Sequence, residues 1–320
     1  MKSKLAISLL LSYLRFLSWV FLSMPKDMLI YNKIRRMVSI DETQWAFVCN
    51  AHLGDTYLLA ALMPDFLSKT NSKEAVFIGY EWAKCLFSQF DMNFRFITVD
   101  KAPSIYWNAY SRFLIKFKKG NVLPGQCSSI NPFRIKSNKQ MLRDFSILTL
   151  HSDDIIAAKP KNSHHTPDYS NKYAYKFNEK AAILFPYSYT VKMIPLDFWK
   201  RVAENLTKTG YSVLFNIGPN EEKINGYQSV SLDLCELSEI TESVSLIIGM
   251  RSGIIDLISN TKTPKIIIYS TERERDIFTV TQYNPELSNK ILELVFDEAT
   301  TIDLLEKIFP DPKDLERILI

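Results

Sequence analysis

Short apolar runs alternate with amphipathic segments from Trp45 onward, and this alternation limits the possible folds more than any other feature of the sequence. An apolar run followed by a helical segment is typical of a βα unit, and consecutive βα units form a parallel sheet with helices on its faces. Two series of such units are present, separated by the polar, proline-containing stretch 157–178. We therefore expect an α/β protein of two domains, as the length of 320 residues also favours.

The first series is expected to form an N-terminal Rossmann-like domain, residues 45–156, followed by a linker, residues 157–180. Its predicted elements are strands 46–50, 75–79, 94–99 and 145–150 and helices 56–69 and 81–90. The second series is expected to form a C-terminal Rossmann-like domain, residues 181–320. Its predicted elements are strands 181–185, 211–217, 228–232, 244–249 and 265–269 and helices 196–209, 252–260 and 301–309. Loops at the carboxyl ends of parallel strands bind ligands, so a ligand cleft between the two domains is expected.

Residues 1–44 are expected to form a helical extension before the first domain. Residues 5–24 are apolar over about the length of a bilayer span, apart from a narrow polar stripe that includes Arg15. A cleaved signal peptide has a shorter apolar core of about 7–15 residues, and a charge near the centre disfavours a spanning helix. Two interpretations stay open: the helix lies in a membrane interface, aided by the basic cluster 33–36, or it packs on the protein itself.

Composition excludes several kinds of site. The formal net charge is +4, from 39 basic and 35 acidic residues, and this small excess does not indicate nucleic-acid binding. The four cysteines, Cys49, Cys85, Cys127 and Cys235, lie far apart in the sequence, with no C-x-x-C pair and no nearby histidine. They predict neither a zinc site nor a disulfide framework, and reduced thiols in a cytosolic protein are expected. No Asp-x-Asp motif occurs, so a metal-independent protein without a bound cofactor is expected.

The turn His52-Leu53-Gly54-Asp55 joins the first predicted strand to a helix. Gly54 permits a sharp turn or a close approach to a ligand. Asp55 is placed either to cap the helix or to project from the strand end into the cleft. The turn is therefore a candidate site, with helix capping as the structural alternative.

Two turns of the second series carry groups suited to a nucleotide. Hydroxyls of Ser188 and Thr190, with the ammonium of Lys192, would bind a diphosphate, and a solvated loop is the alternative. Two carboxylates, those of Glu221 and Glu222, follow the next strand. They would accept hydrogen bonds from a ribose or cap the turn.

The segment Gly249-Met-Arg-Ser-Gly253 is the most phosphate-like turn in the sequence. It joins a strand to a helix, so backbone N–H groups at the helix start would favour an anion. Arg251 could add a bidentate clamp. The spacing of its glycines is neither a Walker loop nor a full G-x-G-x-x-G motif, and is unspecific by itself.

Taken in order, three stretches resemble the bacterial heptosyltransferase-type glycosyltransferases of lipopolysaccharide assembly. The first is the Gly54-Asp55 turn. The second starts with Phe-Pro at 185, passes through Lys192 and Trp199 and ends with Gly-Pro at 218. The third is Ile-Gly-Met-Arg-Ser-Gly from 248, followed by Thr-Pro-Lys-Ile-Ile-Ile-Tyr from 263. The resemblance covers residues 46–90 loosely and 181–270 more closely.

This resemblance implies the GT-B architecture, in which two Rossmann-like domains face each other. The acceptor would bind to the N-terminal half, near His52 and Gly54, and Asp55 would act as general base. A nucleotide-sugar would bind to the C-terminal half. Its implied site consists of Ser188, Thr190, Lys192, Gly218, Glu221, Glu222, Arg251, Ser252, Gly253 and Asp256.

One departure concerns the donor. Where the family has Asp-Ser/Thr-Gly followed by a histidine, this chain has Arg251-Ser252-Gly253 and then Asp256, so the donor sugar and base stay open. The expected function is transfer of a sugar from a nucleotide-sugar to a lipopolysaccharide-type or other lipid-linked glycan. The expected location is cytoplasmic, peripheral on the inner face of a bacterial inner membrane. A non-catalytic nucleotide-binding relative and a nucleotide-sugar epimerase or hydrolase are the alternatives.

Overall fold

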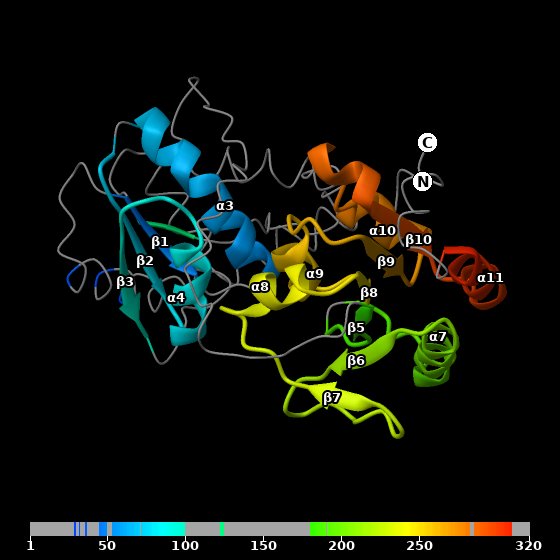
Figure 1. Ribbon diagram of the computed structural model, residues 1–320. Helices are drawn as coiled ribbons and strands as arrows, with labels where there is room; N and C mark the ends of the chain where they lie inside the picture. Colours follow the sequence, from blue (N-terminus) through cyan, green and yellow to red (C-terminus); the bar gives the residue numbers. More distant parts are fainter. Residues whose placement is uncertain are drawn as a thin grey trace, which may run out of the picture.

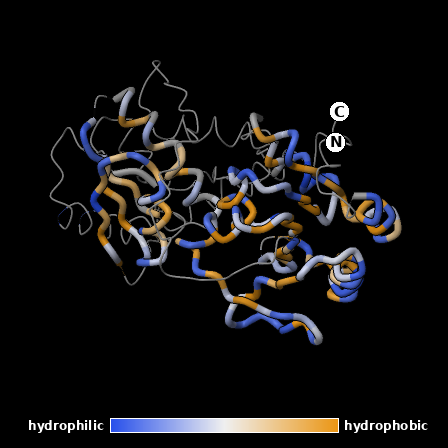
Figure 2. Tube along the Cα trace, in the orientation of Figure 1, coloured by the Kyte–Doolittle hydropathy of each residue, from blue (hydrophilic) through white to orange (hydrophobic). Residues whose placement is uncertain are grey.

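Two parallel sheets form the framework of the protein in a computed structural model (Figure 1). The structure describes residues 29, 32, 36, 45–49, 53–70, 72–99, 122–124, 180–189, 191–281 and 285–308. The strands at 75–79, 181–185, 246–250 and 265–269 are buried along their whole length, and Figure 2 shows the hydropathy along the trace. Strands covered on both faces by helices have to be apolar on both faces, which is why these segments lack an alternating pattern.

The N-terminal sheet has four strands in the order β3-β2-β1-β4, all parallel. Its elements are β1 (Trp45–Cys49), α3 (Leu53–Thr70), β2 (Ala75–Gly79), α4 (Glu81–Ser88), β3 (Phe94–Thr98) and β4 (Val122–Pro124). The central strand β2 is buried along its whole length. Phe77 of this strand stacks on Phe87 of α4 with ring centroids 3.7 Å apart, which fixes α4 against the sheet.

The C-terminal sheet has six parallel strands in the order β10-β9-β8-β5-β6-β7. Its strands are β5 (Ala181–Phe185), β6 (Ser212–Asn216), β7 (Gln228–Val230), β8 (Leu246–Met250), β9 (Lys265–Tyr269) and β10 (Ile291–Val295). Its helices are α7 (Leu196–Lys208), α8 (Leu237–Glu242), α9 (Gly253–Ile258), α10 (Glu272–Phe278), α11 (Glu298–Ile308) and the 3-10 helix η2 (Pro285–Lys290). The chain moves outward from β5 to β7, then returns to β8 and moves outward on the other side. This is the doubly wound order, and its direction reverses between β5 and β8.

The predicted α/β class and the two parallel series are confirmed. Strands 75–79, 181–185 and 265–269 have the bounds expected from the sequence. Strand β10, with a glutamate at its centre, was not expected. That glutamate, Glu293, accepts hydrogen bonds from the backbone N–H of Val280 (2.7 Å) and the hydroxyl of Thr281 (2.6 Å). Both oxygens of its carboxylate therefore have a hydrogen-bond donor within the fold.

Several expectations fall outside the described residues. They include the predicted strand 145–150, the linker apart from Lys180, and most of the N-terminal extension. In that extension Leu29, Asn32 and Arg36 are described and helical, and the membrane contact of residues 5–24 stays a prediction. Among the helices that the structure describes, none combines the length and apolarity needed to cross a bilayer. The exact domain bounds also stay predictions.

Lys265 is a charged residue without exposed surface at the start of β9. Its Nζ donates to the carbonyl oxygens of Thr261 (2.5 Å) and Thr263 (2.7 Å). Burial removes water from the ammonium and lowers the pKa of Lys265 to about 7. In the unfolded chain the same amine keeps its proton up to about pH 10.5.

This difference predicts a stability that rises with pH above about 7, because the unfolded state then binds the proton that the folded state has lost. The free energy of unfolding should be about 2 kcal/mol larger at pH 8.5 than at pH 6, from 1.36 kcal/mol per pKa unit. Urea denaturation at both pH values would measure it. Lys265→Met should remove this contribution, whereas Lys262→Met, at an exposed neighbouring position, should keep it. Equal pH dependence in all three proteins would contradict the assignment.

Candidate active site

The candidate site lies at the carboxyl edge of the C-terminal sheet, where the strand order reverses. Phe185 at the end of β5 pairs with Gly249 of β8, so the loops that follow these strands leave the sheet side by side. Strand β6 pairs with β5 on its other side. The crevice outside such a reversal is the usual ligand position in doubly wound sheets. The three turns selected from the sequence therefore lie next to one another.

The loop after β5 presents one exposed cation and one buried hydroxyl. Lys192 is exposed, while its backbone carbonyl accepts a hydrogen bond from the Ser270 hydroxyl in the loop after β9. Ser188 is buried, and its backbone N–H donates to the sulfur of Met193 at 3.5 Å. The backbone of the loop is thus anchored while the Lys192 side chain reaches solvent. Thr190 lies outside the described residues.

The turn after β6 is held by its own carboxylate. The Gly218 N–H donates to Glu221 Oε2 at 2.6 Å, so Glu221 caps the turn, as one of the two sequence interpretations expected. The Glu222 side chain is exposed, and its backbone carbonyl accepts from the Tyr187 hydroxyl at 2.6 Å. Glu222 is therefore the carboxylate of this turn that stays open to a ligand.

Two tyrosines of the β5 loop were not singled out in the sequence. Besides the contact of Tyr187, the carboxylate of Glu221 near the Tyr189 hydroxyl raises the pKa of Tyr189. The Tyr189 side chain is 85% exposed. Tyr187 thus joins the β5 and β6 loops, and Tyr189 leaves an aromatic ring at the surface of the site. Their Tyr-x-Tyr spacing directly after a buried strand was the available signal.

Arg251 does not present a free guanidinium to the crevice. Its Nη2 lies 2.7 Å from Asp256 Oδ1, and its Nη1 donates to the Ser252 carbonyl at 2.7 Å. Both side chains are almost fully buried, with 7% and 4% exposed. The arginine and the aspartate that distinguish this chain from the family pattern thus neutralise each other. The neighbouring Ser252 Oγ is buried and has no hydrogen-bond partner among the described residues.

The start of α9 faces the N-terminal half. Helices α3 and α9 pack together, as Figure 1 shows. A methyl group added at Gly253 would come within 2.8 Å of the Gly54 nitrogen, and one added at Gly54 would overlap Asp256 Oδ2. Asn260 Nδ2 also donates to the Tyr57 hydroxyl at 2.5 Å. The two glycines that the sequence analysis assigned to ligand binding therefore form the contact between the halves.

Asp55 lies in the first turn of α3, one residue after this contact. Its side chain, like all of His52, lies outside what the structure describes. The backbone of Asp55 is thus located at the meeting point of the halves, and the role of its side chain stays a prediction.

Tyr57 follows in the same helix and is buried. Burial, together with the charge of Asp256, raises the pKa of the Tyr57 hydroxyl.

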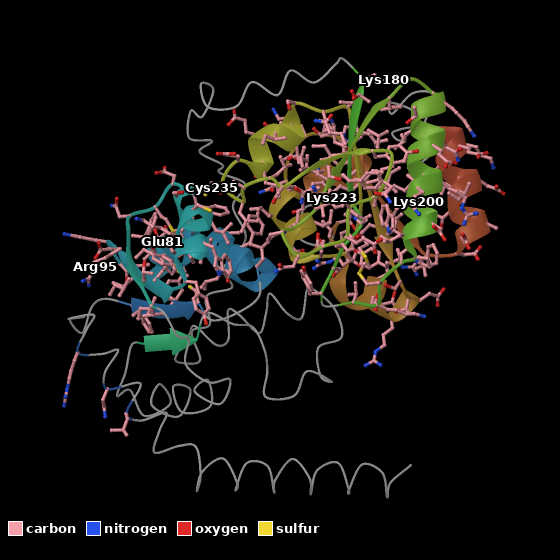
Figure 3. All side chains as sticks on the ribbon, turned by 90° about the horizontal axis from the view of Figure 1, so that it is seen from below. Glu81, Arg95, Lys180, Lys200, Lys223 and Cys235 are labelled. Carbon is pink, nitrogen blue, oxygen red and sulfur yellow. The ribbon has the colours of Figure 1, made fainter. Side chains whose placement is uncertain are left out.

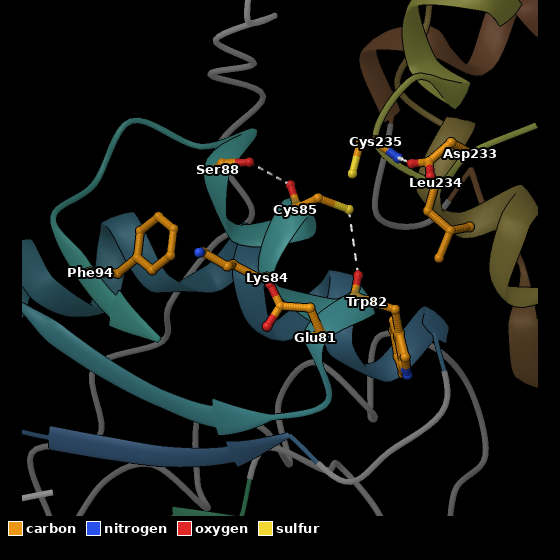
Figure 4. Close-up of a pocket in the computed structure, with 9 residues that line it drawn as sticks. All are labelled: Glu81, Trp82, Lys84, Cys85, Ser88, Phe94, Asp233, Leu234 and Cys235. Atoms are coloured by element: carbon orange, nitrogen blue, oxygen red, sulfur yellow. Dashed lines mark hydrogen bonds between the residues drawn. The ribbon is translucent and has the colours of Figure 1, made fainter. Parts of the chain in front are cut away.

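A groove of about 410 Å³ opens between the halves, and none of the site residues predicted from the sequence lines it (Figure 4). Helix α4 forms one wall with Glu81, Trp82 and Cys85, and residues 233–235 form the other. Most of its lining is apolar. In the part of the chain that the structure describes, no three His, Cys, Asp or Glu side chains are grouped as metal ligands.

Comparison with known proteins identifies the fold. The sequence matches no known protein-family profile and no curated protein. The structure is similar to E. coli heptosyltransferase WaaC with ADP, with 12% sequence identity over 83% of this chain and 99% of that chain and a TM-score of 0.56. It is also similar to E. coli ADP-heptose lps heptosyltransferase II, with 13% identity over 86% and 97% of the two chains and a TM-score of 0.54.

A third similar structure is the glycosyl transferase family 9 protein from Veillonella parvula. It has 13% identity, covers 88% of this chain and 96% of its own, and gives a TM-score of 0.53. The GT-B architecture expected from the sequence is therefore confirmed, and the resemblance to heptosyltransferases is confirmed at the level of the fold.

The buried ion pair generates one prediction. Asp256→Ala should lower the free energy of unfolding by about 3–5 kcal/mol, because it leaves the Arg251 charge buried without this partner. The double variant Arg251→Met/Asp256→Leu should lose much less. Urea denaturation of the single and double variants gives the coupling energy. The exposed pair Lys200–Asp197, at 3.2 Å, is the matched control and should contribute less than about 1 kcal/mol. Additive effects at 251 and 256 would contradict the pairing.

The glycine contact generates a second prediction. Gly54→Ala should destabilise the protein by about 1–3 kcal/mol, since the added methyl overlaps Asp256 and the backbones of α3 and α9 have to separate. Thermal unfolding would show it as a lower Tm. Ser68→Ala, at an exposed position of the same helix, is the control and should be nearly neutral. An unchanged Tm for Gly54→Ala would show that the helices are not in tight contact.

Proposed function

We propose that this chain, which has the fold of heptosyltransferases, is a glycosyltransferase that uses a nucleotide-sugar donor. Its acceptor would be a lipopolysaccharide-type or other lipid-linked glycan. The observation that carries the proposal is the position of the selected turns. Those after β5, β6 and β8 meet at the strand reversal, and the α3 turn that contains Asp55 packs against the last of them.

The donor would bind at the β5 and β6 loops. Lys192 offers an exposed ammonium for a diphosphate, and the carboxylate of Glu222 is open to a ribose. Tyr189 supplies an exposed ring on which a nucleobase could stack. The similar WaaC structure is one with ADP, which supports a nucleoside diphosphate donor. Arg251 would not bind the donor directly, because Asp256 neutralises its charge. It would influence donor binding only by positioning the residues next to it.

The proposed chemistry joins an acceptor oxygen to the anomeric carbon of the donor sugar. The bond from that carbon to the nucleoside diphosphate breaks, so negative charge develops on the leaving phosphate. Lys192 would stabilise this charge without a metal ion. Asp55 would accept the proton of the acceptor hydroxyl, which makes the oxygen a better nucleophile.

The acceptor would approach from the N-terminal half. A lipid-linked acceptor lies at a membrane, so a peripheral contact through residues 5–24 on the inner face of a bacterial inner membrane fits the proposal. The basic cluster 33–36 would add attraction to anionic lipid. Loss of membrane co-sedimentation on removal of residues 1–38 is the observation that would support this contact.

Two substitutions test the donor and base assignments separately. Thermal shift with UDP, GDP, ADP and dTDP species first identifies the nucleobase of the donor. A ligand at about 100 times its Kd adds roughly 2.7 kcal/mol of stability. Lys192→Ala should then abolish the shift, whereas Lys200→Ala, at a lysine of α7 outside the crevice, should keep it. Asp55→Asn should keep the shift and lower the transfer rate by about 100-fold or more.

The outcomes separate the candidate functions. Normal turnover of Asp55→Asn would exclude Asp55 as the base. A thermal shift without transfer to any acceptor would favour a non-catalytic nucleotide-binding protein, an alternative suggested by the internal pairing of Arg251. Hydrolysis or epimerisation of the nucleotide-sugar without an acceptor would favour a nucleotide-sugar hydrolase or epimerase.

A further inference from the structure

Two cysteines that are far apart in the sequence face each other across the groove between the halves. Cys85 lies on α4, and Cys235 lies in the segment between β7 and α8 (Figure 4). Figure 3 places Cys235 on the side of the C-terminal half that faces Glu81 and α4. Both thiols are free in the structure. Two of the four cysteines of the chain, one from each half, thus line the same groove.

Both residues are held in place by hydrogen bonds. The Cys85 thiol donates to the Trp82 carbonyl at 3.5 Å within α4. The Cys235 backbone N–H donates to Asp233 Oδ1 at 2.8 Å, which fixes the turn before α8. Each thiol also influences the pKa of the other, so the two side chains lie near each other in the groove that both line. Each is carried by backbone that hydrogen bonds hold in place.

We propose that Cys85 and Cys235 are a modification site: they form a disulfide between the two halves when the protein meets a low-molecular-weight disulfide oxidant. The Cys85 thiolate attacks one sulfur of the oxidant and releases its other half as a thiolate. The Cys235 thiolate then attacks the Cys85 sulfur of the mixed disulfide and releases the second half. The protein loses two electrons and two protons, and the oxidant becomes two thiols.

The groups around the two thiols determine which thiol attacks the oxidant first and how fast the disulfide forms. Burial raises the pKa of the Cys85 thiol, and the neighbouring Cys235 thiol partly offsets this. Burial, the neighbouring Cys85 thiol and Asp233 all raise the pKa of the Cys235 thiol. Lys84 and Glu81 are the charged groups of α4 at the same groove. Cys85 is therefore the first nucleophile, and the reaction is slow at neutral pH, which keeps the pair reduced where oxidants are scarce.

A disulfide here would link α4 to the segment before α8. It would close a long loop of chain and hold the groove walls together. Cross-links that close long loops restrict the unfolded state most, so the oxidised protein should be more stable. The halves would also lose freedom to move relative to each other.

The test uses the full-length protein in its native state, equilibrated with reduced and oxidised glutathione at increasing oxidised fraction. Peptide mapping by mass spectrometry without reductant should show a Cys85–Cys235 peptide pair in most of the wild-type chains. Non-reducing gels should show a faster band that dithiothreitol removes. The Tm of the oxidised protein should rise and return after reduction.

Matched variants identify the pair. Cys85→Ser and Cys235→Ser should each lose the fast band and the Tm change, while Cys127→Ser and Cys49→Ala should keep both. The serine variants should have the Tm of the reduced wild type, which shows that they fold. Absence of a cross-link in the wild type at the most oxidising ratio, or a cross-link that includes Cys127, would overturn the proposal. The outcome does not depend on the proposed transferase activity.

Discussion

The buried pair of Arg251 and Asp256 is the interaction on which the arrangement of the site depends. An arginine with this little exposed surface needs a matched charge, and Asp256 supplies it from the first turn of α9. The second oxygen of the same carboxylate lies against Gly54, so the pair also determines how closely α3 can approach. One aspartate thus serves both the charge balance of the C-terminal half and the fit of the N-terminal half onto it.

Much of the fold was predictable because parallel strands are short, continuous apolar runs. Strands β2, β5 and β9 consist of such runs, and their bounds agreed with the prediction. Strand β10 has a glutamate at its centre, and sequence periodicity gave no sign that Tyr269, Val280 and Thr281 would match it. The short helices α8 and α10 were missed because six or seven residues carry too little periodicity to separate a helix from a loop.

The candidate site was predictable as a set of turns and unpredictable in its contacts. Each turn follows a buried strand, so its place at the carboxyl edge follows from the parallel order. The chemistry of Arg251 was expected to point to a ligand, and the structure pairs it with Asp256, five positions along the chain. Sequence spacing likewise gave no indication that Tyr189 would lie near Glu221, or that Cys85 and Cys235 would line one groove. These residues belong to separate elements of the chain, and only the completed fold brings them together.

The apolar core does not stop at the boundary between the halves. One continuous cluster includes Phe47 and Tyr57 of the N-terminal half together with Ile183 and Ile255 of the C-terminal half. Separation of the halves by a simple hinge would expose this shared surface to water, at about 25 cal/mol for each Å². Rearrangement by sliding of α3 along α9 would keep it covered. The protein is therefore expected to unfold as one cooperative unit, with its two sheets losing structure together.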